Sequence, residues 1–182
     1  MACDMHTIKV HDKTFTTYLS EEQLQSRIKE LADYINKDFE GKKVVFIAIL
    51  NGSFMFAADI FKHLTVDSEV SFIKLASYKG LNSTGSVTTA IGLDTDLHNR
   101  HVVILEDIID TGKTLHHFLP QLQHQQPASL KIVTLLHKAE MTTHEVPIDY
   151  TGFVIPNKFV VGYGLDYDGL GRNYKEIYQL TD

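Results

Sequence analysis

The chain has 182 residues, of which 23 are acidic and 17 basic, so its formal net charge is −6 at pH 7. This balance argues against a broad nucleic-acid surface, because such surfaces gain affinity from basic side chains that neutralise phosphates. The longest apolar run covers residues 44–50, far short of the roughly 18 residues that indicate a membrane span. The length suits one domain over residues 1–182, and we expect neither nucleic acid nor a membrane as a partner.

Two features of the sequence bear on the cellular location. Cys3 is the only cysteine, so no disulfide can form within the chain. The first ten residues carry no apolar core of the kind that a secretion signal needs. Both features favour a reducing compartment, and we expect the protein in the cytoplasm.

The predicted elements begin with a helix after Ser20, which forms a capping box with Gln23. One face of this helix is apolar until Gly41 stops the pattern, through Leu24, Ile28, Leu31 and Ile35. Strand and helix patterns then alternate: strand 43–50, helix 53–64, strands 70–76 and 87–91, a strand that begins at residue 102, helix 114–124 and strand 130–136. Such alternation predicts an α/β fold with a mostly parallel central sheet flanked by helices.

Residues 77–86 interrupt the alternation with a polar stretch rich in Ser, Thr, Gly and Asn. Its few apolar side chains cannot offset the entropy of ordering the backbone, about 1–2 kcal/mol per residue. We expect a mobile loop that closes over bound substrate and excludes water. A surface loop with no part in catalysis is the alternative.

The most informative segment is the apolar run that begins at Val102. It continues directly into Glu106 and Asp107, and Asp110 follows three residues later. A continuous apolar run of this length is typical of a parallel strand that is buried on both faces. Ligands of such sheets bind at the carboxyl edge, so we expect the functional site at these carboxylates.

The loop after this strand has the composition of a phosphate site. Thr111 and Thr114 offer hydroxyls, Gly112 allows close approach of the backbone, and a helix that starts near Lys113 adds free N–H groups. A P-loop would need glycine at the position of Asp107, whose carboxylate would repel a triphosphate. One phosphate beside sugar hydroxyls indicates a ribose phosphate. A buried strand followed by a capped helix without function is the alternative.

This segment resembles the phosphoribosyl pyrophosphate (PRPP) signature of the type I phosphoribosyltransferases, and within them the branch that acts on hypoxanthine and guanine. Further matching segments occur in the family's order at residues 49–56, 77–78, 136–138 and 157–166, followed by Arg172. The resemblance implies the family's fold, in which a small hood accompanies the central sheet.

The resemblance also implies roles around the ribose phosphate. Glu106 and Asp107 would hold the ribose hydroxyls, and Asp110 would be the general base near the purine imidazole. PRPP binding would extend from Asp110 through the loop that holds the 5-phosphate, with Thr111, Gly112, Lys113 and Thr114. A solvated pair of loop carboxylates is the alternative for Glu106 and Asp107, and a helix N-cap is the alternative for Asp110.

On the purine side, Lys138 would donate to the exocyclic oxygen of a 6-oxopurine. Adenine presents an amino group there, so two donors would face each other; an unpaired polar group in a buried site costs on the order of 1–3 kcal/mol. By resemblance, Phe159 would stack on the base, the Val160 backbone would read its edge, and Asp166 would also lie near it. An exposed strand-end lysine and a core aromatic are the alternatives for Lys138 and Phe159.

The pyrophosphate would be bound by Asn51, Gly52, Ser77, Tyr78 and Arg172. The family commonly has a basic residue where this chain has Asn51, which removes that side-chain contact. Backbone N–H groups of the loop can still bind an anion, and the family suggests a cis peptide between Leu50 and Asn51.

The resemblance places Mg²⁺ beside three carboxylates, those of Glu106, Asp107 and Asp166. Ten histidines could suggest another metal, but His116, His117 and His124 fall within a predicted helix without a clear chelating spacing, which disfavours zinc.

The implied function is purine salvage: Mg-dependent transfer of the 5-phosphoribosyl group from PRPP to hypoxanthine or guanine, giving IMP or GMP and pyrophosphate. A homodimer or homotetramer is expected. The alternatives are a PRPP-binding regulator on the same scaffold and a nucleotide-binding module without catalysis.

Overall fold

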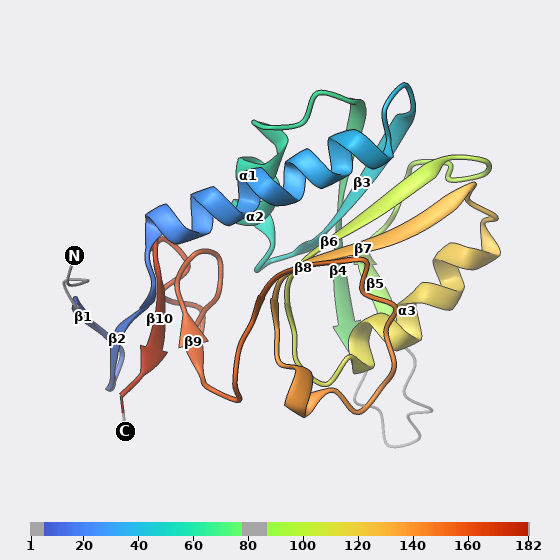
Figure 1. The fold of residues 1–182 in the computed structure, drawn as a ribbon. Coiled ribbons are helices and arrows are strands. Elements are labelled where there is room, and N and C mark those ends of the chain that lie inside the picture. Colours follow the sequence, from blue (N-terminus) through green and yellow to red (C-terminus); the bar gives the residue numbers. More distant parts are fainter. Residues whose placement is uncertain (1–5, 78–86, 182) are drawn as a thin grey trace, which may run out of the picture.

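The computed structural model describes residues 6–77 and 87–181, and for residues 76–77 and 87–91 it describes the backbone alone. Two sheets and three α-helices make up this part of the chain (Figure 1). The larger sheet carries the predicted alternation of strands and helices. The smaller sheet joins segments near both ends of the chain.

The larger sheet has the strand order β5-β4-β3-β6-β7-β8. Its strands are β3 (Lys43–Leu50), β4 (Asp67–Ser77), β5 (Val87–Ile91), β6 (His101–Ile109), β7 (Ser129–His137) and β8 (Tyr150–Val154). Five of them run parallel and β5 runs antiparallel to β4. The central strands β3 and β6 are apolar and buried over most of their length, as parallel strands covered on both faces must be. The predicted α/β class is confirmed.

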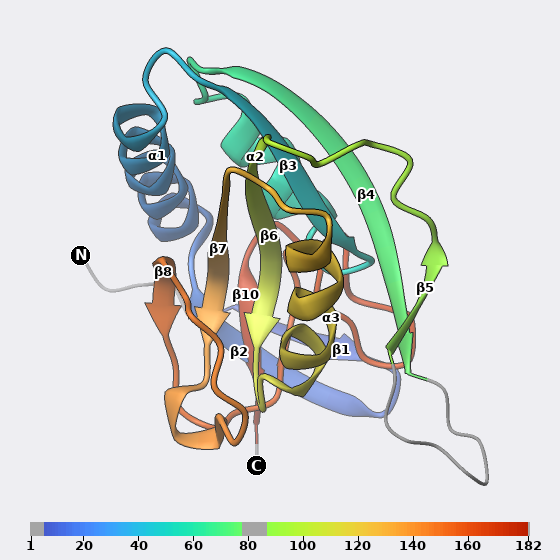
Figure 2. The same cartoon turned by 90° about the vertical axis from the view of Figure 1, so that its right-hand side faces the viewer.

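Helices cover both faces of this sheet. Helices α1 (Glu21–Asp38) and α2 (Phe54–Phe61) pack on one face, and α3 (Lys113–His124) packs on the other, in front of the sheet in Figure 2. The capping box of α1 is confirmed, because the Ser20 and Gln23 side chains each bond the other's backbone N–H, at 3.3 and 2.9 Å. Helix α2 ends three residues earlier than expected, since the chain turns more tightly at Lys62.

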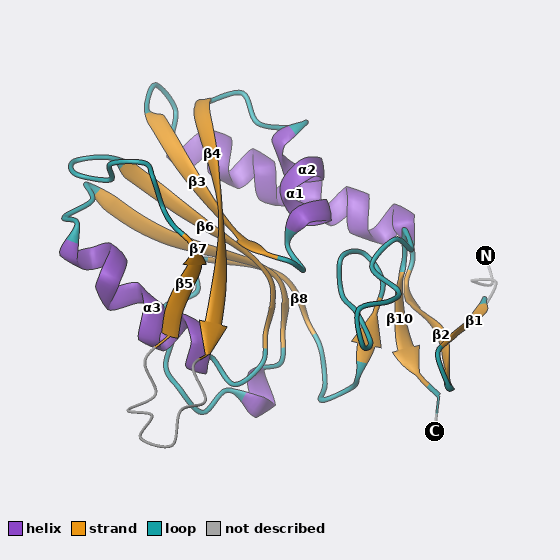
Figure 3. Ribbon diagram, turned by 180° about the vertical axis from the view of Figure 1, so that it is seen from behind, coloured by secondary structure: helices purple, strands orange, loops and turns teal. Residues whose placement is uncertain are grey.

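The smaller sheet is antiparallel with the order β1-β2-β10-β9 and lies beside the larger one (Figure 3). Its strands are β1 (Thr7–Val10), β2 (Lys13–Leu19), β9 (Val160–Val161) and β10 (Ile177–Leu180). Phe15, Val161 and Tyr178 form its apolar centre. It is the hood that the family resemblance implies, and we call it the hood sheet.

Sequence patterns did not predict the hood strands or β8. These strands are short and pair with partners far along the chain, as β2 does with β10, so local periodicity carries little information about them. A 3₁₀ helix, η1 (Ala139–Met141), follows β7. None of the helices described is long and apolar enough to cross a membrane.

Candidate active site

The carboxyl ends of β3, β6 and β7 lie at one edge of the larger sheet, because these strands are adjacent and parallel. The loop after β3 contains Asn51 and Gly52, the loop after β6 contains Asp110, and Lys138 follows β7. Three segments that are distant in sequence therefore supply polar groups to the same edge, which is where open α/β sheets bind ligands.

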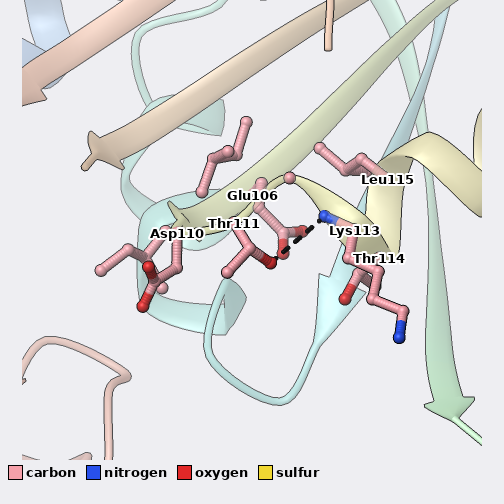
Figure 4. Close-up of a pocket in the computed structure, with 9 residues that line it drawn as sticks. Glu106, Asp110, Thr111, Lys113, Thr114 and Leu115 are labelled. Atoms are coloured by element: carbon pink, nitrogen blue, oxygen red, sulfur yellow. Dashed lines mark hydrogen bonds between the residues drawn. The ribbon is translucent and has the colours of Figure 1, made fainter. Parts of the chain in front are cut away.

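The loop between β6 and α3 forms a small pocket of about 100 Å³ (Figure 4). Glu106 and residues 108–115 line it. Gly112 is the N-cap of α3 with φ of +76°, and a Cβ there would lie 2.4 Å from the carbonyl oxygen of His144. The first residues of α3 therefore belong to the lining of the pocket. Their free N–H groups and the positive end of the helix dipole favour an anion there. The Thr111 hydroxyl accepts from the Lys113 N–H at 3.4 Å.

A second segment, residues 142–146, forms hydrogen bonds with this loop. The N–H groups of Thr143 and His144 both donate to the Thr111 carbonyl at 3.1 Å, and the Thr142 hydroxyl donates to the Asp110 carbonyl at 3.2 Å. Sequence reasoning missed this segment, since nothing in its local pattern indicates a contact with a loop about 30 residues earlier.

Glu106 and Asp107 lie within β6 rather than after it. The Glu106 carboxyl is buried, and burial together with the Asp107 charge raises its pKa well above the ordinary value. Its Oε2 atom has no hydrogen-bond partner among the described residues. The alternative of a solvated loop pair is wrong, because these carboxylates belong to a buried strand.

The Asp107 carboxylate faces the loop after β3. A Cβ on Gly52 would lie 1.5 Å from Asp107 Oδ2, so only glycine lets the backbone pass this close to the carboxylate. Burial raises the pKa of Asp107 to about 6; two backbone hydrogen bonds and the Arg172 charge oppose this shift, and the Asp166 charge adds to it. The charges of Arg172, predicted to bind pyrophosphate, and of Asp166, predicted to bind the metal, therefore both act on Asp107.

Arg172 and Asp166 form an ion pair of 2.6 Å, with both side chains partly buried. Arg172 Nη1 also donates to the Gly164 carbonyl at 2.6 Å. Gly164 in turn packs on Gly52, because a Cβ there would lie 2.0 Å from the Gly52 carbonyl oxygen. The structure thus brings Gly52, Asp107, Asp166 and Arg172 together, whereas Glu106, the third predicted metal carboxylate, lines the pocket of the loop between β6 and α3.

Asp110 and Lys138 form the second polar pair of the edge, with 3.2 Å between Lys138 Nζ and Asp110 Oδ2. Lys138 is only 7% exposed, so the alternative of an exposed strand-end lysine is wrong. Asp110 Oδ1 is shielded from solvent and has no partner in the described part of the chain. The N-cap alternative for Asp110 is also wrong, because Gly112 occupies that position.

Phe159 precedes β9 and is 47% exposed, so the alternative of a core aromatic is wrong. Its ring meets Tyr167 edge-to-face at 5.8 Å. Val160 lies in the edge strand β9 and pairs with Gln179 of β10. The neighbouring pair, Phe159 and Leu180, is hydrogen-bonded, because the Leu180 N–H donates to the Phe159 carbonyl. Because hydrogen-bonded pairs alternate in antiparallel ladders, the backbone groups of Val160 face away from β10.

The remaining predicted residues are distributed as follows. Asn51 is exposed, and the peptide between Leu50 and Asn51 is cis, as expected. Ser77 ends β4. Tyr78 and most of the predicted lid, residues 78–86, lie outside the described residues.

His116, His117 and His124 lie in helix α3, as expected, and two of them meet a third histidine from outside the helix. The rings of His116 and His117 meet that of His144, with centroids 5.4 to 6.1 Å apart. Within the described ranges, no group of three or more His, Cys, Asp or Glu side chains is arranged to hold a metal ion by itself.

Comparison with known proteins gives the family. A family model described as a phosphoribosyl transferase domain matches residues 15–168. The chain belongs to the phosphoribosyl transferase family.

Relatives within this family have related names. The hypoxanthine-guanine phosphoribosyltransferase of Lactococcus lactis is 44% identical over 160 residues, 87% of this chain and 85% of that protein. The hypoxanthine-guanine-xanthine phosphoribosyltransferase of Tritrichomonas foetus is 42% identical over 159 residues, 87% of each chain. A crystal structure of a hypoxanthine-guanine phosphoribosyltransferase from Bacillus anthracis, 42% identical, aligns with a TM-score of 0.86 over 91% of this chain and 98% of that one. The larger sheet and its helices thus have the type I phosphoribosyltransferase fold.

Proposed function

We propose that this chain is a purine-salvage enzyme that transfers the 5-phosphoribosyl group of PRPP to hypoxanthine or guanine and releases pyrophosphate. The observation that carries the proposal is the pair Asp110–Lys138. This pair lies at the same sheet edge as residues 111–114, which we call the phosphate loop. A base and a ribose phosphate can then bind side by side. The names of the relatives support the same reaction, and no observation favours the regulatory alternative.

The phosphate loop would bind the 5-phosphate of PRPP. Its N–H groups at the start of α3 and the hydroxyls of Thr111 and Thr114 are suited to phosphate oxygens. Glu106 lines the same pocket, and burial raises its pKa, which favours the protonated carboxyl. A neutral carboxyl can both donate to and accept from ribose hydroxyls, which satisfies its Oε2 atom.

The purine would bind between Lys138 and the hood sheet. The Lys138 ammonium has three protons and donates one of them to Asp110. Another can be donated to the exocyclic oxygen of a 6-oxopurine. The exposed Phe159 ring offers a stacking surface. The outward backbone groups of Val160 can read the edge of the base.

The pyrophosphate side fits Mg²⁺. Burial and the Asp166 charge both raise the pKa of Asp107, so a cation held by these carboxylates would offset the cost of the Asp107 charge. Mg²⁺ needs only one or two protein carboxylates when substrate phosphates and water complete its shell. The ion, when bound, neutralises charge that develops on the leaving pyrophosphate. Arg172 supplies a fixed positive charge beside the same group.

The bond changes follow from this arrangement. The bond between the ribose C1 carbon and the pyrophosphate oxygen breaks, and a bond from the purine nitrogen to C1 forms. The imidazole proton of the base passes to Asp110, whose Oδ1 atom is unpaired in the described structure. Asp110 is the general base in this scheme, and Lys138 keeps it oriented.

The assembly and location belong to the same proposal. We expect a homodimer or homotetramer in the cytoplasm, in line with the family resemblance and with a chain that has one cysteine.

An assay of PRPP with each purine in turn tests the function. We expect pyrophosphate release and IMP or GMP formation with hypoxanthine and guanine, little turnover with adenine, and loss of turnover in excess chelator with recovery on added Mg²⁺. Xanthine measures how far the specificity extends. Tight binding of PRPP with no turnover of any base would instead support the regulatory alternative.

A further inference from the structure

Tyr163 is a buried side chain that the proposed reaction does not use. It lies in the hood loop, which we define as residues 162–166, and is only 1% exposed. Its backbone N–H donates to the Tyr174 carbonyl at 2.8 Å within the hood. Its hydroxyl, by contrast, donates to Asp59 Oδ2 in helix α2 at 2.6 Å. Tyr163 therefore connects the hood loop to the helix layer of the larger sheet.

The Asp59 carboxylate is built to receive this hydroxyl. Its side chain is 14% exposed, and it also accepts from Gln25 of α1 at 2.7 Å and from Lys62 at 2.6 Å. Burial raises the pKa of Asp59, but the hydrogen bonds from Lys62, Tyr163 and Gln25 outweigh burial and hold the pKa below its ordinary value. The carboxylate is thus charged, and a hydrogen bond to a charged acceptor is stronger than one between neutral groups.

The residues next to Tyr163 in the hood loop touch the active site. Gly164 packs on the Gly52 carbonyl, and Gly52 packs on the Asp107 carboxylate. Two residues further, Asp166 pairs with Arg172, which also holds the Gly164 carbonyl. A shift of the loop at Tyr163 would therefore change both the packing of Gly164 on Gly52 and the position of Asp166 relative to Asp107.

We propose that Asp59 and Tyr163 are positioning residues for the pyrophosphate side of the active site, an inference that rests on the proposed function. The hydrogen bond from the Tyr163 hydroxyl to the Asp59 carboxylate keeps the hood loop in contact with Gly52. Through that loop they place Asp166 and Arg172 for PRPP. Their own contacts are with α1, α2 and the hood rather than with the phosphate loop.

The test compares two variants that each remove one tyrosine hydroxyl. Tyr163→Phe breaks the bond to Asp59, and the matched control Tyr150→Phe breaks a similar bond from β8 to Asp38 of α1, away from the sheet edge. We expect Tyr163→Phe to raise the KM for PRPP about 3- to 20-fold, which is less than the roughly 10- to 150-fold of a lost hydrogen bond to a charged group because the hydroxyl acts on PRPP only through the hood loop. The KM for hypoxanthine should rise less, and amides of the hood loop should exchange faster. Tyr150→Phe should leave both KM values unchanged.

Variants of Asp59 separate positioning from general stability. Asp59→Asn keeps an oxygen that can accept from Tyr163, so it should retain most of the affinity for PRPP, whereas Asp59→Ala should match Tyr163→Phe. The double variant Asp59→Ala/Tyr163→Phe should be no worse than Asp59→Ala alone, because both changes remove one interaction.

Two outcomes overturn the inference. One is a loss of thermal stability in Tyr163→Phe with the KM for PRPP unchanged, which makes the pair purely structural. The other is an equal effect of Asp59→Asn and Asp59→Ala. If the unmodified protein shows no turnover, the proposed function has failed, and the same variants are then compared by calorimetry with PRPP and Mg²⁺ as the probe.

Discussion

The two halves of the active site are built in different ways. The half that we propose for the ribose phosphate comes from one continuous segment, residues 106–114, in which a buried strand runs into a loop and a helix. The half that we propose for the base and the pyrophosphate is assembled from residues at separate places in the chain: Gly52, Lys138, Phe159, Asp166 and Arg172. The first half is contiguous in sequence, whereas the second half exists only through contacts between distant segments.

The largest effect is expected in the continuous half. Asp110→Asn keeps the shape of the side chain but removes the base that accepts the purine proton. We expect kcat to fall on the order of 10²- to 10⁴-fold, the usual contribution of general acid–base catalysis, with PRPP affinity nearly unchanged. Steady-state kinetics and calorimetry with PRPP measure the two quantities. The control Asp33→Asn removes a surface ion pair of α1 and should be neutral; a near-normal kcat for Asp110→Asn would remove Asp110 from the mechanism.

Lys138→Ala probes the assembled half. The change removes the donor to the exocyclic oxygen and leaves Asp110 without its partner. We expect kcat/KM for hypoxanthine to fall about 10- to 100-fold, consistent with about 1–3 kcal/mol for an unpaired buried group, while the KM for PRPP changes little. Lys131→Ala is the matched control, since Lys131 pairs with Asp38 near the opposite end of the same strand. Equal effects on both substrates would contradict a base-specific role.

A pH series of thermal stability tests the burial of Asp107, where the two halves meet. Its pKa is about 6 in the folded chain against 3.8 for the free side chain. A raised folded pKa means that the contribution of Asp107 to stability is fully present below about pH 4 and is lost as the pH rises through about 6. Asp107→Asn should therefore have little effect at pH 4 and stabilise the protein at pH 8, with an upper limit of about 3 kcal/mol at about 1.4 kcal/mol per pKa unit. Equal destabilisation at both pH values would show that the fold does not disfavour the charged form of the Asp107 carboxylate.

The smallest effect concerns the stacking surface. Phe159→Leu keeps an apolar side chain and removes the aromatic face, so we expect the KM for hypoxanthine to rise about 2- to 10-fold, in line with about 0.5–1.5 kcal/mol for an aromatic contact. Phe72→Leu, another exposed phenylalanine at 40%, is the control on β4. A KM for hypoxanthine that is the same in both variants would place the base elsewhere.

The contrast between the halves also explains what the sequence could predict. Strand 43–50 and the mostly parallel sheet follow from continuous apolar runs that alternate with helix patterns. The phosphate loop follows from the residues between Asp110 and Thr114, because these residues are neighbours in the chain. The burial of Lys138 and the exposure of Phe159 do not follow from their local patterns, which taken alone favour the opposite. Only the family resemblance pointed to those two residues.

Other parts of the site left no local signal. The contact of Gly164 with Gly52 joins residues more than 100 positions apart. The segment 142–146 meets the phosphate loop through the Thr142 hydroxyl and through backbone N–H groups, and bonds from backbone groups can be made by almost any residue type. The bond between Asp59 and Tyr163 likewise depends on the packing of the hood against α2. Periodicity describes the face that an element buries, but it does not identify the partner on the other side.

The order of strands in the hood sheet has a consequence for biosynthesis. Phe159 and Val160 lie at strand β9, whose partner β10 ends at Leu180, and β10 in turn bridges to β2 near the beginning of the chain. A ribosome makes the phosphate loop long before it makes β10. During translation the growing chain can therefore complete the half proposed for phosphate while the half proposed for the base still lacks the strand that joins β9 to β2. Chains that end before residue 177 should then bind phosphate compounds but not purines.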